Sequence, residues 1–546
     1  MPSHDEWETI VFFGCGATAS RGATAEAVGN KAAGLIRMAE AGLPVPPGFV
    51  LPTTLCREYY RHGRRLPENL LELLAKNIQQ LEKATRQTFG GDRHPLLVSV
   101  RSGAAVSMPG MMDTILNVGL CGRTLPALIR MTGNPRHAWD SYRRLIQAYG
   151  EVVHGLSADA FEPLLDDSLR REAVPAAGEL DVAALKDLTG DLLARFEARA
   201  GEPFPQEPLA QLAGAVEAVF RSWQGPRAVE YRRLHRLDDL AGTAVTVQVM
   251  VFGNMGGTSG SGVAFTRDPT TGEDHLYLDF LRNAQGEDIV SGRVPVQGSG
   301  SLPDALPELG RDLRQVGRQL ERLFLDAQDF EFTVQEGRLY LLQSRQAKRT
   351  AWAALRIACD LVEEGLIDES TALGRLAEYD LDAIQWVRLR SSGTCHPLGT
   401  GTPASPGVAV GEIAFEPESA VAMASHGRTP ILVRTDLTTA DLAGLVASAG
   451  VLTARGGRTS HAAVVARQLN KVCIVGCRDL VVIPSGRRGC RIGGLQFAEG
   501  DALSLDGHSG NIYGGRLEVV VERPTQYLSE IRRWKARQRE RLASGG

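Results

Sequence analysis

The sequence lacks several features that would place it in a common class. No run of apolar residues approaches the roughly 18 needed to cross a bilayer. The first residues set acidic side chains ahead of a very short apolar stretch, which is the wrong order for a secretory leader. The formal net charge is -4, so no basic surplus indicates a nucleic-acid partner. We therefore expect a cytoplasmic protein with no membrane and no nucleic acid among its partners.

Cysteine is also sparse. Eight cysteines are spread over 546 residues, without the density of a disulfide-stapled scaffold or the paired spacing of a structural zinc site. The closest pair, Cys473 and Cys477, begins inside an apolar run that predicts a buried strand. We expect reduced thiols, with a core role for this pair rather than metal or redox chemistry.

The two common phosphate-binding sequences are missing as well. Neither GxxxxGK(S/T) nor GxGxxG occurs in the chain, which argues against a P-loop and against a Rossmann dinucleotide site. The chain is nevertheless long enough, and with 43% hydrophobic residues apolar enough, for several domains with separate cores. Any nucleotide site in this chain must bind the phosphates with a different arrangement of residues.

Hydrophobic patterns predict an α/β multidomain protein. We predict a first α/β lobe at 1–120, a helical insertion at 121–240, a second lobe at 241–350, a helical linker and hinge at 351–400, a small α/β domain at 401–515 and a charged helical tail at 516–546. The second lobe opens with alternating valines at Val245, Val247 and Val249, which are typical of a strand. The Ser-, Thr-, Gly- and Pro-rich stretch 391–407 predicts the interdomain hinge.

His461 lies in the stretch GGRTSHAAVVAR. The two glycines let the backbone approach a ligand closely, Thr459 or Ser460 can cap a helix, and the Ala/Val run predicts that helix with His461 in its first turn. Free N–H groups and the positive helix end keep the ring neutral there and stabilise an attached phosphoryl group. We predict covalent phosphoryl transfer to His461; the alternative is a histidine that only caps or packs.

Two cations stand beside small residues in the first lobe. Lys31 lies in GNKAAGL, and Arg101 lies in VSVRSGAAVSMPGMMDT. Together they can hold a polyphosphate in two places, because an ammonium and a guanidinium both bind phosphate oxygens. Each cation taken alone is more simply a surface charge.

The stretch QDFEFTVQEGRLYLLQSR predicts a β-hairpin that turns at residues 336–337. A three-residue loop, which we predict, brings together two pairs: Glu331 with Gln343, and Asp329 with Arg345. A two-residue loop would put the members of these pairs on opposite sides. The predicted register lines one wall with oxygens and an arginine, which suits Mg²⁺ held against phosphates. The alternative is a solvated salt-bridge face.

These motifs resemble those of a known family. GGRTSHAAVVAR is similar to the phosphohistidine motif of the phosphoenolpyruvate-utilising enzymes. MPGMMDT, VFGNMGGTSGSGVAFTRDPTTGE, NAQGED and the hairpin stretch resemble the ATP-grasp module of pyruvate phosphate dikinases. The resemblance covers nearly the whole chain. It implies an ATP-grasp-like two-lobed nucleotide-binding module with a helical insertion, followed by a swivelling β/β/α phosphohistidine domain.

The resemblance also implies a set of site residues and a reaction. It implies ATP contacts at Lys31, Arg101, Gly110, Thr114 and Gln248, and it puts Glu331, Gln343 and Arg345 at phosphate and magnesium. From the hairpin register we add Asp329 to the cofactor-binding residues, and we predict Glu331 and Gln343 as the metal ligands. The glycine-rich loop at 256–262 would cover the phosphates. His461 would accept a pyrophosphoryl group from ATP and then discharge one phosphoryl group to inorganic phosphate.

The sequence departs from the family in two respects. Asn30 and Ala32 flank Lys31 where the family commonly has glycines. Full-length dikinases continue into a PEP/pyruvate-binding barrel, whereas this chain stops at Gly546. We therefore expect onward transfer on a separate PEP/pyruvate-binding protein or on a further part of a longer enzyme, and a homodimer stays open.

Two rival functions are a non-catalytic ATP-binding sensor or scaffold, and the phosphodonor half of an enzyme for another small-molecule acceptor. The presence of all the key charged groups argues against decay into a sensor. An enzyme for another acceptor needs an acceptor domain that the sequence does not reveal.

Overall fold

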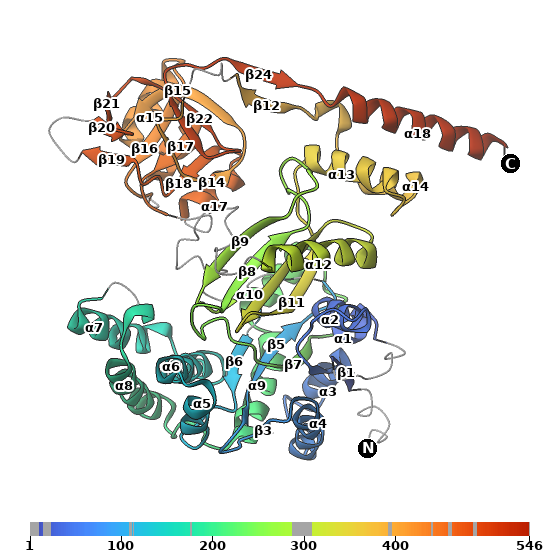
Figure 1. The fold of residues 1–546 in the computed structure, drawn as a ribbon, viewed down its shortest axis with the longest axis vertical. Coiled ribbons are helices and arrows are strands. Elements are labelled where there is room, and N and C mark those ends of the chain that lie inside the picture. Colours follow the sequence, from blue (N-terminus) through green and yellow to red (C-terminus); the bar gives the residue numbers. More distant parts are fainter. Residues whose placement is uncertain are drawn as a thin grey trace. The chain divides into compact units, whose positions relative to one another are not determined.

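The structure, a computed structural model, describes residues 10–14, 23–106, 108, 112, 114–174, 177–286, 308–390, 396–437, 441–456, 461–483 and 489–544, with a few side chains excepted. The chain forms two compact units, which are treated separately. The first comprises Met1–Ser261, Arg282–Gln285 and Phe330–Arg345, and the second comprises the remaining residues. Figure 1 labels their elements. Among the helices of the described ranges, none combines the length and apolar character that a bilayer crossing needs.

A sheet of five described strands forms the centre of the first unit, in the order β1-β2-β7-β5-β6. The strands are β1 (Val11–Phe13), β2 (Gly48–Leu51), β5 (Val98–Gly103), β6 (Thr114–Val118) and β7 (Ala244–Val249). The valines of β7 are buried in one core, as their alternation predicts. The sequence places β7 in the second lobe, but it pairs with β2 and β5 in the first sheet.

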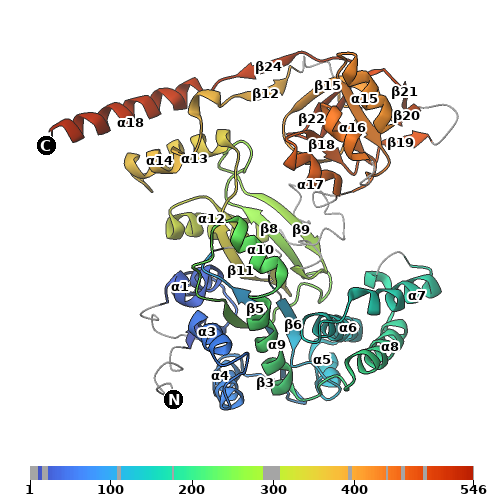
Figure 2. The same ribbon diagram turned by 180° about the vertical axis from the view of Figure 1, so that it is seen from behind.

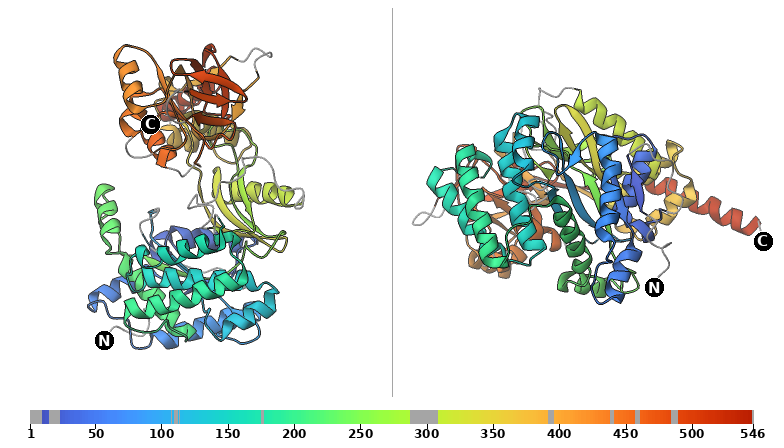
Figure 3. Two further views of the ribbon diagram at one scale, coloured as in Figure 1. Left: turned by 90° about the vertical axis from the view of Figure 1, so that its left-hand side faces the viewer. Right: turned by 90° about the horizontal axis from the view of Figure 1, so that it is seen from below.

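Helices cover the apolar face of this sheet, and Figure 3 shows those of the insertion in teal to green. The α-helices among the described residues of this unit are α1 (Ala25–Val28), α2 (Asn30–Glu40), α3 (Thr53–Arg61), α4 (Leu70–Thr85), α5 (Thr124–Thr132), α6 (Pro135–Val152), α7 (Glu162–Glu172), α8 (Val182–Ala200), α9 (Pro208–Ser222) and α10 (Pro226–Leu234). Tyr142, Ile146 and Tyr149 of α6 are buried at helical spacing. The insertion predicted from that spacing is therefore helical.

A second sheet of four described strands has the order β11-β10-β8-β9. Its strands are β8 (Gly260–Phe265), β9 (Tyr277–Arg282), β10 (Gln328–Gln335) and β11 (Arg338–Gln346), and α12 (Leu309–Phe324) precedes β10. Glu336 and Gly337 form the turn of the β10–β11 hairpin with φ values of 50° and 80°. Two consecutive positive φ angles define a two-residue turn, whose twist matches that of the strands. The three-residue loop predicted from the sequence is therefore wrong.

An α/β domain in the second unit carries His461. Its sheet of eight described strands has the order β13-β23-β22-β15-β16-β17-β18-β14. The strands are β13 (Gly399–Thr400), β14 (Thr402–Ser405), β15 (Val408–Ala414), β16 (Pro430–Arg434), β17 (Gly450–Thr453), β18 (Val472–Val475), β22 (Ala502–Asp506) and β23 (Asn511–Gly514). We call it the carrier domain.

Two cores lie against the sheet of the carrier domain. One includes side chains of the helices α15 (Pro417–Ser425), α16 (Leu442–Ala447) and α17 (His461–Gln468), which Figure 2 shows beside the strands. The other includes side chains of a small sheet made of β19 (Leu480–Ile483), β20 (Gly489–Ile492) and β21 (Leu495–Ala498). The sheet, the small sheet and the helices correspond to the predicted β/β/α domain.

A two-stranded ribbon leads into and out of the carrier domain. β12 (Trp386–Leu389) pairs antiparallel with β24 (Val519–Glu522), and α13 (Ala351–Glu363), α14 (Glu369–Leu376) and α18 (Thr525–Ser544) share a core beside it. The hinge predicted at 391–407 needs correction, because β13 and β14 belong to the domain's sheet. Residues 391–395 lie outside the described ranges. Proline and glycine, the basis of that prediction, are compatible with short edge strands.

The cysteines behave as predicted wherever they are described. Six of them are buried and free: Cys56, Cys121, Cys359, Cys473, Cys477 and Cys490. Burial raises the pKa of the Cys473 thiol to about 12, which disfavours thiolate chemistry. The core role of Cys473 and Cys477 is confirmed, whereas Cys15 and Cys395 lie outside the described residues.

Candidate functional site

Three of the predicted ATP residues share one face of the five-stranded sheet. Arg101 of β5 lies opposite Thr114 of β6 and opposite Thr246 of β7. Ser99 lies opposite Gln248 in the same strand pair. Since residues directly opposite each other point to the same side of a sheet, these side chains form one polar face. The apolar core lies on the other side of β7.

This polar face contains hydrogen-bonding groups that the described protein atoms do not satisfy. Thr246 Oγ1 and Gln248 Oε1 are buried without a hydrogen-bond partner among the described residues, although Gln248 Nε2 donates to Pro46 O at 3.1 Å. A buried unsatisfied polar group costs about 1–3 kcal/mol. A ligand with donors directed at this face would remove that cost. The sequence patterns above did not identify Thr246 as a site residue. Its position two residues before Gln248 on the same strand is the signal that could have identified it.

Lys31 is held beside the end of β5 by a close contact between backbones. Gly29, at φ 79°, separates α1 from α2, and a Cβ placed there would lie 2.3 Å from Gly103 O. Asn30 N then donates to Ala104 O at 2.9 Å. Lys31 therefore lies in the first turn of α2. Asn30 and Ala32, which stand where the family commonly has glycines, are compatible with this helix.

The charge of Lys31 depends on its neighbours. Burial of the ammonium group lowers its pKa to about 8, the positive charges of Arg101 and Arg345 act in the same direction, and the carboxylate of Glu331 opposes them. These four side chains come from α2, β5, β10 and β11. The structure thus brings the charges of four predicted residues close enough to influence one another. Lys31, Arg101 and Glu331 are separated from each other by at least 70 residues along the chain.

The remaining predicted residues of this site are placed less closely. Gln343 is partly exposed on β11, and Asp329 is buried on β10. Gly110 lies outside the described residues. Glu331 and Arg345 both act on Lys31 although the hairpin loop has two residues. Such influences act through space and do not show which side chains of the hairpin meet, so the pairs of Glu331 with Gln343 and of Asp329 with Arg345 stay predictions.

The predicted glycine-rich loop at 256–262 is only partly a loop, because residues 260–262 begin strand β8. The loop that precedes β8 runs over residues 252–259 and has an exposed tip. Phe252 N donates to Gln335 Oε1 at 2.8 Å, and Gly256 N donates to Asn283 Oδ1 at 3.0 Å. Glu336 N donates to Ser259 Oγ at 3.0 Å. Residues 257–258 between these contacts are exposed. Backbone N–H groups in such a loop can bind phosphate oxygens.

The carrier domain presents His461 at the start of a helix. β17, α17 and β18 form a parallel βαβ unit, so α17 starts in the loop that follows the carboxyl end of β17. The predicted position of His461 in the first helical turn is confirmed for the backbone, where α17 begins at His461. Its side chain, and all of Thr459 and Ser460, lie outside the described residues. Backbone N–H groups at this end of α17 suit an anion.

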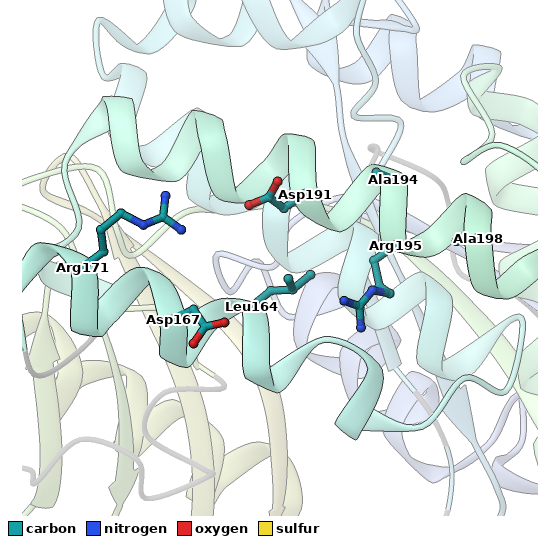
Figure 4. Close-up of a pocket in the computed structure, with 7 residues that line it drawn as sticks. All are labelled: Leu164, Asp167, Arg171, Asp191, Ala194, Arg195 and Ala198. Carbon is teal, nitrogen blue, oxygen red and sulfur yellow. The ribbon is translucent and has the colours of Figure 1, made fainter.

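A groove on the helical insertion is unrelated to these residues. It has a volume of about 380 Å³ and lies between α7 and α8, where Asp167, Arg171, Asp191 and Arg195 contribute charged side chains (Figure 4). None of the predicted site residues lines it. Charges of both signs alternate around it, which is typical of a solvated surface between helices.

Two family models and several known proteins match parts of this chain. Residues 64–299 match the family model "Pyruvate phosphate dikinase, AMP/ATP-binding domain", and residues 427–510 match "PEP-utilising enzyme, mobile domain". A pyruvate, phosphate dikinase from Clostridium symbiosum is 44% identical over 510 residues, which cover 93% of this chain and 58% of that protein. For the Rhizobium meliloti (strain 1021) protein of the same name, identity is 42% over 538 residues, or 96% of this chain and 60% of that protein.

A chloroplastic pyruvate, phosphate dikinase from Flaveria pringlei is 43% identical over 509 residues, which cover 93% of this chain and 53% of that protein. The chain thus spans little more than half the length of these relatives. Both matched domains contain elements described above, including β5, β6 and β7 in the first and α17 in the second. The chain thus contains a domain that matches the AMP/ATP-binding domain of pyruvate phosphate dikinase and a second that matches the mobile domain of PEP-utilising enzymes.

Proposed function

We propose that the chain binds ATP at the polar face of the first sheet and transfers a pyrophosphoryl group from ATP to His461. The observation that carries this proposal is the set of charges that act on the buried Lys31 ammonium group, namely those of Arg101, Glu331 and Arg345. Three cations against one carboxylate leave a surplus of positive charge beside a sheet face on which Thr246 Oγ1 and Gln248 Oε1 have no hydrogen-bond partner among the described residues. A polyphosphate with a hydrogen-bonding base matches both properties.

The residues also fit the magnesium ion that ATP carries. Glu331, whose charge acts on Lys31, supplies a carboxylate. Gln343 of β11 is the second predicted ligand; the two-residue turn does not by itself place it on the side of Glu331, so its amide oxygen stays a prediction. Oxygen ligands of these kinds are the ones Mg²⁺ prefers, often with water and phosphate oxygens completing the set. When bound, the ion would neutralise phosphate charge during transfer.

The transfer itself requires a neutral imidazole. A ring nitrogen of His461 forms a bond to the β phosphorus of ATP, and the bond from that phosphorus to the α–β bridging oxygen breaks, which releases AMP. Inorganic phosphate then takes the γ phosphoryl group, so that pyrophosphate leaves and a phosphohistidine remains. The start of α17 favours both the neutral ring and the attached anion.

The name of the relatives indicates a final acceptor. Pyruvate, phosphate dikinases are named for pyruvate and phosphate. We propose pyruvate as the acceptor of the phosphoryl group on His461, on a PEP/pyruvate-binding domain or protein reached by movement of the carrier domain. The β12–β24 ribbon is the segment that such movement would bend.

Incubation with Mg²⁺ and ATP labelled at the β phosphate tests the proposal. We expect acid-labile, base-stable label on the protein and none on His461→Ala, with AMP released in equal amount. A protein that binds ATP but acquires no label would favour a non-catalytic nucleotide sensor instead.

A further inference from the structure

None of the roles proposed above involves the NAQGED motif at 283–288. Its first three residues, Asn283, Ala284 and Gln285, directly follow β9 and belong to the first unit. Asn283 has a φ of 49°, in the left-handed region that asparagine tolerates better than most residues. The chain therefore changes direction directly after β9.

Two side chains of this motif bind the glycine-rich loop at 252–259. Asn283 Oδ1 accepts a hydrogen bond from Gly256 N at 3.0 Å, and Asn283 N donates to Ser259 O at 2.9 Å. Gln285 Nε2 donates to Asn254 Oδ1 at 2.9 Å, and both of these side chains are buried. The motif thus has hydrogen bonds to three positions of the loop.

The backbones of the motif and the loop also meet. A Cβ placed at Gly253 would lie 2.2 Å from Ala284 O and 2.4 Å from Ser261 Oγ, so only glycine allows this approach. The loop contacts the β10–β11 turn as well, where Gly337 N donates to Thr258 O at 3.0 Å. The loop is therefore held by two separate turns of the first unit.

The tip of the loop presents backbone donors to solvent. Ser259 N donates to Gly256 O at 3.0 Å, which closes a β-turn over residues 256–259. The N–H groups of its central residues, Gly257 and Thr258, have no protein acceptor in the described part of the chain, and both residues are exposed. The turn carries no charged side chain. An anionic oxygen can therefore accept from these two N–H groups without charge repulsion.

We propose that Asn283 and Gln285 are positioning residues for phosphate binding. They hold the loop in one place before ATP binds, so that the N–H groups of Gly257 and Thr258 meet its terminal phosphates. The hairpin that contacts the loop also carries Glu331, the proposed magnesium ligand, so the loop reaches the phosphates that Mg²⁺ bridges. The inference rests on the proposed function and adds to it the residues that fix the loop. A loop ordered in advance loses less conformational entropy on binding, which strengthens affinity.

Nucleotide titration calorimetry in a His461→Ala background, which prevents turnover, tests this inference. Asn283→Gly removes the acceptor for Gly256 N and suits the left-handed backbone, so it should not strain the fold. We expect Mg-ATP affinity to fall about fivefold, the worth of one hydrogen bond, and AMP affinity to change less than about twofold. Gln285→Met keeps the length of the side chain and removes the donor to Asn254. It should lower Mg-ATP affinity about tenfold.

Hydrogen exchange measures the order of the loop directly. In the Asn283→Gly variant without nucleotide, the segment 253–259 should exchange faster than in the parent, while the unfolding temperature stays the same. Asn470→Gly is the matched control, because Asn470 is an exposed asparagine of the carrier domain with a φ of 51°. It should change neither the exchange of this segment nor the affinity for either nucleotide.

Unchanged Mg-ATP affinity in both Asn283→Gly and Gln285→Met would overturn the inference while the proposed function stands. Equal losses for ATP and AMP, together with a lower unfolding temperature, would make the two residues structural and would also overturn it. Fast exchange of the segment 253–259 in the parent would show that the loop is not held in advance. A parent that binds neither nucleotide would contradict the proposed function itself, and this inference with it.

Discussion

The nucleotide site and the carrier site are built in opposite ways. Lys31, Arg101, Gln248 and Glu331 come from four elements spread over 300 positions of the sequence. The carrier site comes from one βαβ unit, within which α17 starts at His461. A dispersed site depends on long-range packing for every distance, whereas a contiguous one depends on a single loop and helix. The two should therefore differ in their sensitivity to backbone changes.

The largest effect that would sharpen this comparison is expected at Gly29. Gly29→Ala should destabilise the first unit by about 3 kcal/mol and abolish ATP binding, since its Cβ meets Gly103 O at 2.3 Å and its φ is positive. Gly42→Ala, at φ 76° with no atom within 4 Å of the new Cβ, should cost only about 1 kcal/mol. Urea denaturation measures both. Equal costs would show that backbone conformation alone, not the close approach, makes Gly29 important.

Lys31→Met tests the charge of the dispersed site. We expect Mg-ATP affinity to fall about 100-fold, because a charge-assisted contact to phosphate is lost. The stability of the carrier domain should be unaffected. Lys76→Met removes an exposed lysine of α4 and should leave affinity unchanged. Calorimetric titration distinguishes the two, and an unchanged affinity in Lys31→Met would contradict the proposed site.

The pKa of Lys31 predicts a pH dependence. Between pH 7 and 9 the free protein loses this proton, so Mg-ATP affinity should fall about tenfold, with nearly one proton taken up on binding at pH 9. Because the folded pKa is lowered to about 8 from the ordinary 10.5, the unfolded chain holds more protons in that window, and the contribution of Lys31 to stability rises from pH 8 to 10.5. Titrations in buffers of different ionisation enthalpy measure the uptake.

Lys31→Arg provides the control for this pH dependence, because a guanidinium stays charged throughout that range. The variant should bind Mg-ATP equally at pH 7 and 9 and take up no proton. A wild-type affinity that does not change with pH would show that Lys31 keeps its proton in the free protein.

The smallest expected effect concerns Thr246. Thr246→Val removes a buried hydroxyl without a described partner and should stabilise the free protein by about 1 kcal/mol or leave it unchanged. Thr243→Val should destabilise it by a similar amount, since Thr243 Oγ1 accepts from Gly103 N at 3.1 Å and donates to Ala244 O at 3.0 Å. Thermal unfolding compares them. A destabilised Thr246→Val would mean that its hydroxyl is already satisfied.

Sequence patterns predicted the local parts of both sites. Alternating valines predicted β7, and the Ala/Val run predicted a helix whose first turn contains His461; both are confirmed. The burial of Cys473 and Cys477 followed from the same kind of pattern. These features depend on residues within a few positions of each other, where the periods of helix and strand act directly.

Tertiary structure decided what those patterns could not. β7 joins the first sheet rather than the second, the hairpin turns in two residues, and a paired ribbon leads into the carrier domain. The lowered pKa of Lys31 arises from burial and from neighbours far away in sequence. Sequence spacing fixes which face a side chain takes along its own element. Which elements pack against that face depends on how the apolar residues of the whole chain are buried. This packing sets the charges around each site residue and the distances between site residues.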